Sequence, residues 1–161
     1  MRKIGLYEVS IILFFVIVPI AGTIVEACFF KDSTTVFGLL LQWFTFSGVG
    51  LRLFSAGLKQ AIKPSFTATE IFKTDRSSYL VVRELGFANI CIGIIGIVSL
   101  FLPGFRLAAA VAGGLYFGFA GFLHVFHKRD QDEIFAMISD LFIFVVFVVL
   151  VTANFLQGRP V

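Results

Sequence analysis

The sequence predicts an all-α protein, a polytopic membrane bundle of five transmembrane helices with a short interfacial helix after the second. Of its 161 residues, 58% are hydrophobic and only 14% are charged, whereas soluble domains carry about 25% charged residues. The chain also contains five apolar stretches long enough to cross a bilayer, which takes about 20 residues each. These observations exclude an ordinary soluble domain and predict a single integral membrane domain over residues 1–161.

Each predicted span has its own sequence support. The first begins after Arg2 and Lys3, and its apolar run is too long for a signal peptide and lacks a small-x-small cleavage site, so we expect it to be retained. Pro19 should kink it, because proline removes a backbone donor. The turn Pro103-Gly104-Phe105 joins the third span to the fourth as a hairpin. The spans cover about residues 4–30, 36–58, 82–102, 107–126 and 134–155.

The distribution of positive charge predicts the orientation, because lysine and arginine are enriched on the cytoplasmic side. With five spans, nine of these residues fall on the side of the N-terminus and three on the other, and Arg52 lies within a span. We therefore expect a multi-pass inner-membrane protein with its N-terminus in the cytoplasm and its C-terminus outside, and no nucleic-acid partner. The nine are Arg2, Lys3, Lys59, Lys63, Lys73, Arg76, Arg83, Lys128 and Arg129; the three are Lys31, Arg106 and Arg159.

The one long connection, about residues 59–81, contains a predicted helix start. Thr67-x-x-Glu70 has the pattern of a capping box, and Phe66 with Ile71 fits a hydrophobic staple. Pro64 supports a break just upstream. We predict a short interfacial helix over about residues 68–74, which is either a simple connector or a lid over the polar residues described next.

Polar residues of all five spans fall at one depth. They lie within about seven residues of the predicted cytoplasmic ends, which is a layer roughly 10 Å deep at 1.5 Å per residue. Because charge in hydrocarbon is costly, a shared layer predicts one interior site. The candidate ligand-binding or proton-handling residues are Glu8, Arg52, Glu84, Asn89, His124 and Asp140.

The charged members of this layer leave alternatives open. Arg52 either snorkels to the interface or forms a buried pair with Glu84, Asp140 or Glu8. Adjacent helix positions diverge by about 100°, and we assign Glu84 to the interior and its neighbour Arg83 to the lipid head groups.

The remaining members have structural as well as functional interpretations. His124 and Asp140 could form a protonatable pair, but a lone histidine is more often a structural hydrogen-bonding residue. Asn89 either bridges helices or orients a ligand. Glu26 lies near the opposite end of the first span and is expected to be a separate outer feature.

Small residues recur at helical spacing on the third and fourth spans, as Gly86, Gly93 and Gly96 and as Gly114, Gly118 and Gly121. Such faces let helices approach closely, so they predict packing within the bundle or against a second copy or another membrane protein. The two cysteines and two histidines have no metal-ligand spacing. No metal is expected, and no particular cofactor is indicated.

Four segments resemble a family of small uncharacterised bacterial integral membrane proteins. The family shows a glutamate before Gly-Phe-Ala-Asn, a later glycine shortly before a histidine and an aspartate in the last helix, matched here by Glu84, Asn89, His124 and Asp140. More loosely, the chain resembles DoxX-type bundles, whose relatives are associated with respiratory or thiol redox systems, although no residue here carries that role over. The segments are Lys63–Phe72 (KPSFTATEIF), Val82–Ile97 (VRELGFANICIGIIGI), Gly118–His124 (GFAGFLH) and Ser139–Phe142 (SDLF).

Three functions are compatible with these residues. The leading hypothesis is a bundle that binds or passes a small lipophilic or ionisable ligand at the polar layer, with membrane lipids around it. The first alternative is a membrane-embedded acid–base enzyme acting on a lipid through Glu84 and His124. The second is a structural or assembly subunit of a membrane complex, which would use the glycine-rich faces.

Overall fold

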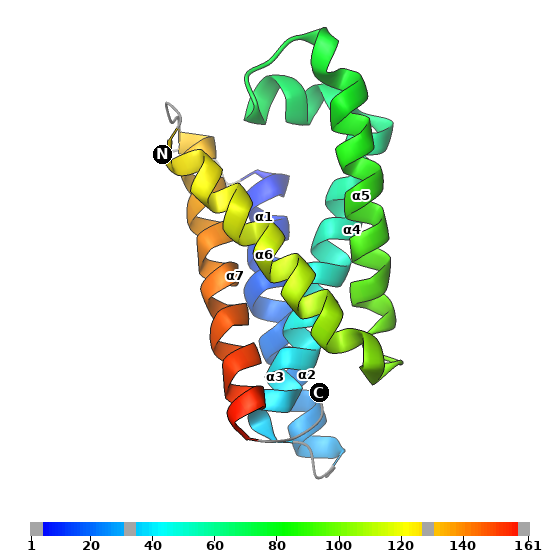
Figure 1. Ribbon diagram of the computed structural model, residues 1–161, viewed down its shortest axis with the longest axis vertical. Coiled ribbons are helices and arrows are strands. Elements are labelled where there is room, and N and C mark those ends of the chain that lie inside the picture. Colours follow the sequence, from blue (N-terminus) through cyan, green and yellow to red (C-terminus); the bar gives the residue numbers. More distant parts are fainter. Residues whose placement is uncertain (1–4, 31–34, 127–130, 158–161) are drawn as a thin grey trace.

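The computed structural model describes residues 5–30, 35–126 and 131–157, and these parts are helical with short turns and no strand (Figure 1). Within them, five helical segments are long and apolar enough to cross a membrane, so the predicted fold class is confirmed. The start of α1 and the end of α7 lie at opposite ends of the bundle (Figure 1), as an odd number of spans requires. The segments are Leu6–Phe29, Val36–Ile62, Arg76–Val98, Pro103–Val125 and Glu133–Leu156.

The first span is interrupted by a π-helical segment. It consists of α1 (Leu6–Ile12), the π-helix η1 (Leu13–Ile17) and α2 (Val18–Phe29). Val18 donates its backbone N–H to the carbonyl of Leu13, and Pro19 has no N–H, so the carbonyl of Phe14 lacks a donor from its own helix. The hydroxyl of Ser47 supplies one at 2.7 Å. The break that Pro19 predicts in the first span is thus a π-helical segment. The second span supplies the missing donor through Ser47.

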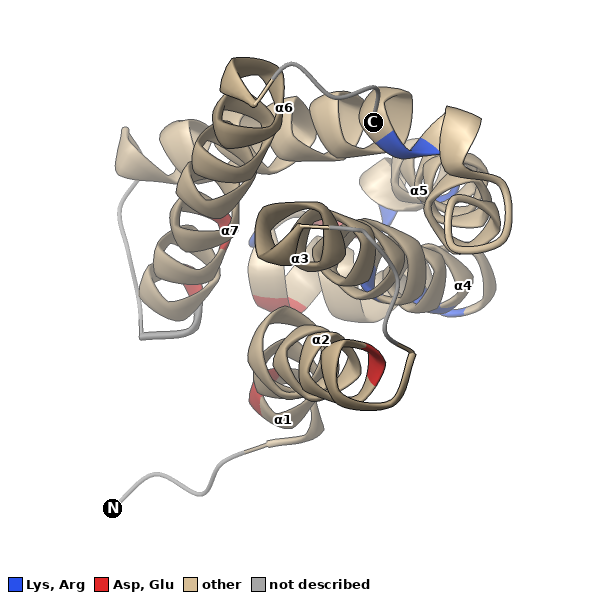
Figure 2. Cartoon of the chain, turned by 90° about the horizontal axis from the view of Figure 1, so that it is seen from below, with Lys and Arg blue, Asp and Glu red and all other residues tan. Residues whose placement is uncertain are grey.

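The second span is the central one. It consists of α3 (Val36–Phe44), the π-helix η2 (Thr45–Leu51) and α4 (Arg52–Ile62). Its most apolar window is 61% buried, against 22–39% for the other spans. Seen from below, α3 lies among α2, α6 and α7, with α4 and α5 to one side (Figure 2). The other helices therefore pack around this span.

The connection after α4 differs from the prediction. It becomes helical at Pro64 and continues as the π-helix η3 (Phe66–Ile71), so the helix begins and ends earlier than residues 68–74. The predicted capping box is wrong because Thr67 lies inside this helix with its side chain buried. Proline fits the first position of a helix, where its missing N–H costs nothing, and Pro64 therefore sets the start.

The third span begins before Val82, because α5 (Tyr79–Val98) follows directly on the 3-10 turn η4 (Arg76–Ser78). Asp75 caps η4 by accepting from the backbone N–H of Ser77 at 2.9 Å and from its hydroxyl. These hydrogen bonds hold the pKa of the Asp75 carboxyl below its usual range.

The turn between the third and fourth spans is as tight as the sequence predicts. It is the 3-10 segment η5 (Pro103–Phe105), and α6 (Arg106–Val125) follows at once. However, α6 leaves α5 at an angle and crosses to α7 (Gln131–Leu156), so the pair diverges beyond the turn instead of forming a parallel-sided hairpin (Figure 1).

Glycines set how closely α5 approaches the second span. A Cβ on Gly96 would lie 2.5 Å from the backbone nitrogen of Gly50, and one on Gly57 would lie 2.6 Å from the carbonyl oxygen of Gly86. Real Cβ atoms essentially never approach other atoms this closely. The backbones of α4–η2 and α5 are therefore in direct contact.

The glycines of α6 serve the same purpose against α7. A Cβ on Gly118 would lie 2.8 Å from the ring of Phe144, and one on Gly121 would lie 2.8 Å from the side chain of Leu141. The glycine faces of the third and fourth spans are thus both filled within the chain.

Replacing Gly96 by alanine should destabilise the bundle, because the added Cβ meets backbone and cannot be relieved by a side-chain rotation. We expect a loss of about 1–3 kcal/mol in the free energy of unfolding, measured in mixed detergent micelles. Gly104→Ala is the matched control, since nothing lies within 4 Å of a Cβ there. Equal stabilities for the two variants would show that η2 and α5 are not held at this distance.

Candidate functional site

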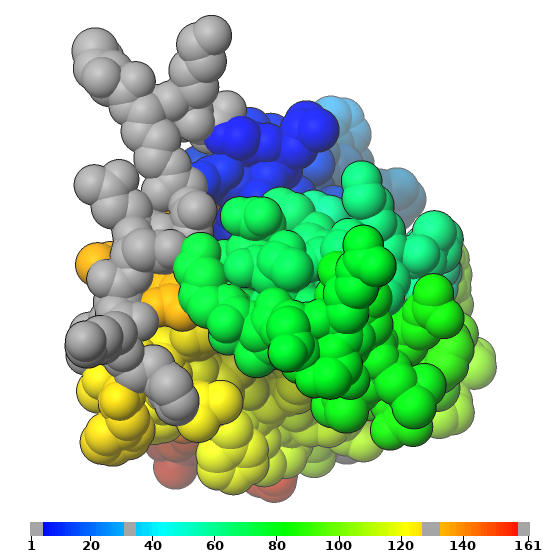
Figure 3. All heavy atoms as spheres, turned by 90° about the horizontal axis from the view of Figure 1, so that it is seen from above, coloured from blue at the N-terminus to red at the C-terminus, as the bar shows by residue number. Residues whose placement is uncertain are grey.

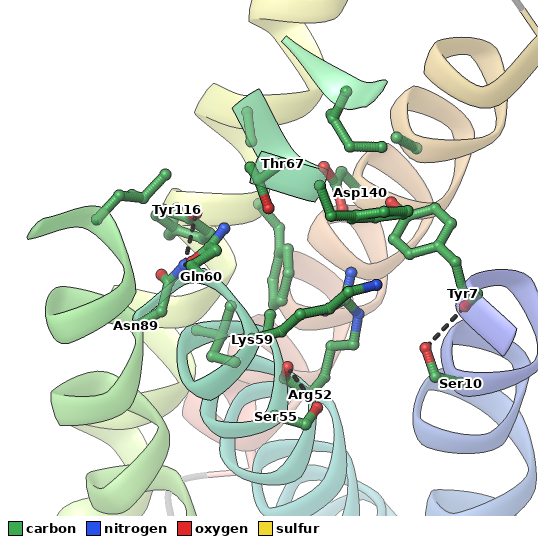
Figure 4. A pocket seen from close by; sticks show the side chains of 18 of the residues that line it. Tyr7, Ser10, Arg52, Ser55, Lys59, Gln60, Thr67, Asn89, Tyr116 and Asp140 are labelled. Atoms are coloured by element: carbon green, nitrogen blue, oxygen red, sulfur yellow. Dashed lines mark hydrogen bonds between the residues drawn. The ribbon is translucent and has the colours of Figure 1, made fainter. Parts of the chain in front are cut away.

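A cavity of about 470 Å³ lies at the end of the bundle where α1 begins. Side chains of all five spans and of the connection after α4 line it (Figure 4). Its walls include apolar residues such as Phe14, Leu53 and Phe117. Its polar lining residues are Tyr7, Ser10, Arg52, Ser55, Lys59, Gln60, Thr67, Asn89, Tyr116, His124 and Asp140.

Arg52 enters the cavity from the first turn of α4 and is partly buried. Its guanidinium carbon lies 5.6 Å from the centre of the Tyr7 ring, within the range of a cation–π contact. Its Nε is buried without a hydrogen-bond partner. Arg52 therefore reaches the interior, but part of its hydrogen-bonding capacity is unused.

Asp140 projects from α7 toward the same space (Figure 4). It is close enough to Arg52 for electrostatic attraction, yet the structure shows no salt bridge between them. The buried Arg52–Asp140 ion pair that the sequence allowed is thus absent, and the two side chains face a common volume instead.

Asn89 links three spans at one wall of the cavity. Its side-chain nitrogen donates to Gln60 Oε1 at 2.8 Å and to the hydroxyl of Tyr116 at 3.3 Å. The side chain is only 1% exposed, and its Oδ1 has no hydrogen-bond partner. Asn89 therefore bridges α4, α5 and α6, and one of its acceptor atoms is left without a partner.

Lys59 and the connection after α4 form another part of the wall. Lys59 Nζ lies 3.3 Å from the centre of the Phe66 ring, and Phe66, Thr67 and Ile71 of η3 all line the cavity. Figure 3 shows this connection (green) at the surface between α1 (blue) and the end of α6 (yellow). It is therefore part of the cavity wall and more than a simple connector.

The structure does not bring all six predicted residues together. Arg52, Asn89, His124 and Asp140 line the cavity, whereas Glu8 and Glu84 do not. Glu8 accepts a hydrogen bond from the backbone N–H of Gly5 at 2.9 Å at the start of α1.

The inward orientation predicted for Glu84 is wrong. Its side chain is exposed, while Val82, Gly86 and Asn89 are buried. Two residues along a helix turn its face by about 200°, so a glutamate two residues from both Val82 and Gly86 must point away from the bundle.

Several lining residues were missed by the sequence analysis. Lys59 could have been found, because it lies seven residues after Arg52 and therefore on the same face of α4. Tyr7 and Ser10 share a face of α1 in the same way, and Ser10 donates to the carbonyl of Tyr7 at 2.7 Å. The pairing of Gln60 with Asn89 joins two spans and has no local sequence pattern.

A second polar cluster lies at the other end of the bundle. One carboxylate oxygen of Glu26 accepts from Gln42 Nε2 at 2.7 Å and from Trp43 Nε1 at 2.6 Å. Arg106 donates to Gln42 Oε1 at 2.7 Å and is only 8% exposed. Glu26 is thus separate from the cavity, as expected, but it belongs to a network that joins α2, α3 and α6.

The fold and the cavity together define a multi-pass membrane helix bundle with a polar-lined interior space. The chain belongs to a family of unknown function (DUF6790), whose model matches residues 9–158. The expectation of an uncharacterised family is therefore confirmed, and the match is longer than the segments that carried the resemblance.

No curated protein and no solved structure matches the chain. Nothing connects it to DoxX-type proteins, so that resemblance stays a prediction, as does a bacterial origin.

Glu26→Leu should destabilise the bundle, because it leaves the side chains of Gln42 and Trp43 without their shared acceptor. Unsatisfied buried donors cost about 1–3 kcal/mol, which unfolding in mixed micelles would measure. Glu84→Leu is the control, since it removes an exposed carboxylate and should change stability little. If the two substitutions lower the free energy of unfolding equally, the hydrogen bonds of Glu26 do not stabilise the bundle.

Proposed function

We propose that the protein binds a small lipophilic or ionisable ligand inside the membrane, in the cavity between the five spans. The observation that supports this most directly is a space of about 470 Å³ with apolar walls and converging polar groups. Small-molecule sites have volumes of about 300–1,000 Å³ and this kind of lining.

The unpartnered polar atoms at the cavity support the proposal further. Buried polar groups normally have hydrogen-bond partners, yet Arg52 Nε and Asn89 Oδ1 have none within the described residues. A bound molecule with both donor and acceptor groups would satisfy them. In this proposal Arg52 and Asn89 orient the polar part of the ligand, and the aromatic walls hold its apolar part.

The alternative of an acid–base enzyme loses one of its two residues. Glu84 is exposed and outside the cavity, so it cannot act with His124 on one substrate. The alternative of a structural subunit needs a surface other than the glycine faces, because those faces are filled within the chain.

We infer that the end of the bundle with the cavity faces the cytoplasm and that the C-terminus lies outside. Nine lysine and arginine residues against three support this orientation. The cavity would then open to the cytoplasmic leaflet, and membrane lipids would surround the bundle.

Filling the cavity should displace the ligand. Ala120 lines it, and Ala120→Leu should reduce the bound molecules roughly tenfold, equivalent to ~1.4 kcal/mol. Native mass spectrometry of protein purified with its host lipids would measure the non-protein mass that stays bound. Ala112→Leu on the exposed side of the same helix is the control. Equal retention in both variants would contradict binding in this cavity.

Cysteine labelling tests the orientation. Cys28 is exposed near the end of α2 and should react with a membrane-impermeant maleimide in intact cells when Cys91 is replaced by serine. A Glu70→Cys variant without the native cysteines should react only after the membrane is opened, because Glu70 is exposed on the connection after α4. The opposite labelling pattern would show that the protein has the reverse orientation in the membrane.

A further inference from the structure

The charge of the cavity lining narrows the class of ligand. Two strong cations, Arg52 and Lys59, lie two turns apart on one face of α4 and both line the cavity. Asp140 is the one carboxylate among the described lining residues. A single carboxylate does not balance two cations, so the lining carries an excess of positive charge.

Neither cation forms a salt bridge within the described residues, although Asp140 lies near enough to attract Arg52. Arg52 contacts the ring of Tyr7, and Lys59 lies over the ring of Phe66. Aromatic faces attract cations but do not neutralise them. Because uncompensated charge beside hydrocarbon is costly, an anionic group between Arg52 and Lys59 would be stabilised there.

The surroundings of the two cations are apolar and aromatic. Phe14, Phe66 and Phe117 line the same space, which suits a hydrocarbon chain. The wall is also incomplete at this end, because two of its lining residues, Leu6 and Phe72, are 91% and 42% exposed. A chain could therefore enter from the membrane while its head group stays near the open end.

Resting on the proposed function, we infer that the ligand is a single-chain amphiphile with an anionic head group, a carboxylate or a phosphate, which binds between Arg52 and Lys59. The guanidinium of Arg52 can hold either anion with two hydrogen bonds, and one of these would use its unpartnered Nε. Asn89 Oδ1 can accept from a hydroxyl group of the ligand, which a singly protonated phosphate supplies and an ionised carboxylate does not. A volume of about 470 Å³ favours one chain over the two of a phospholipid.

The test is competition against tritiated laurate, measured by scintillation proximity on the full chain in a maltoside detergent. Laurate, dodecyl phosphate, dodecanol and dodecylamine have chains of the same length and differ only in the head group. We expect laurate and dodecyl phosphate to compete at least about tenfold better than dodecanol and dodecylamine, as charge-assisted hydrogen bonds predict. The ratio between the two anions then distinguishes a carboxylate ligand from a phosphate ligand.

Variants assign the effect to the two cations. Arg52→Gln and Lys59→Gln should each weaken laurate binding roughly tenfold and leave competition by dodecanol unchanged, because they remove charge and not apolar surface. Lys63→Gln is the matched control, since Lys63 is an exposed lysine one turn further along that does not line the cavity. Lys59 is also exposed, so we expect Lys59→Gln to fold. This variant therefore tests the inference even if Arg52→Gln does not fold.

The failures are distinguishable. If dodecanol competes as well as laurate, and Ala120→Leu weakens the binding of both, the inference of an anionic head group is wrong. The cavity is then still a binding site. If no probe binds, or if Ala120→Leu and Ala112→Leu bind all probes alike, the proposed function itself is overturned.

Discussion

The direct backbone contact between α4–η2 and α5 is the constraint on which the rest of the site depends. Glycines at Gly50, Gly57, Gly86 and Gly96 remove the side chains that would keep the two helices apart. In a membrane, such close packing replaces the hydrophobic driving force that soluble bundles use. It brings Asn89 Nδ2 to 2.8 Å from Gln60 Oε1. It also fixes the rotation of α4, so that Arg52 and Lys59 face the cavity.

The two polar clusters differ in how their side chains are paired. At one end, Glu26, Gln42 and Trp43 pair with one another, and Arg106 joins through Gln42 while its Nε stays buried without a partner. At the other end, Arg52 and Asp140 share a space without a salt bridge, and Asn89 keeps an unused acceptor. An apolar core that includes Phe15, Leu41 and Ile143 separates the clusters. The first cluster has the character of a tie between helices, and the second that of a site with room for another molecule.

The sequence predicted the five long apolar helices because each needs only a run of apolar residues, which is a local property. Of the six candidate residues that it predicted, four line the cavity, since intramembrane polar side chains turn inward wherever they can. It failed at Glu84, because the two-residue spacing from Gly86, which puts this side chain about 200° from the glycine face of α5, was not used. It failed again at Thr67, where a capping pattern was present but Pro64 had already started the helix.

Hydrogen bonds between distant spans could not be predicted from the sequence. The bond from Ser47 to the carbonyl of Phe14 depends on a register change in one span and on the position of another. The link from Arg106 to Gln42 joins residues 64 positions apart. No periodicity within a single helix encodes either contact.

The network around Glu26 also has a consequence for biosynthesis. Because the chain is made from its N-terminus, Glu26 can meet Gln42 and Trp43 as soon as the first two spans are side by side. Arg106 belongs to the fourth span and can join only after the third has passed through the membrane. The guanidinium therefore contributes nothing to the insertion of the first two spans, and the completed network is a product of late assembly, when already inserted helices come together.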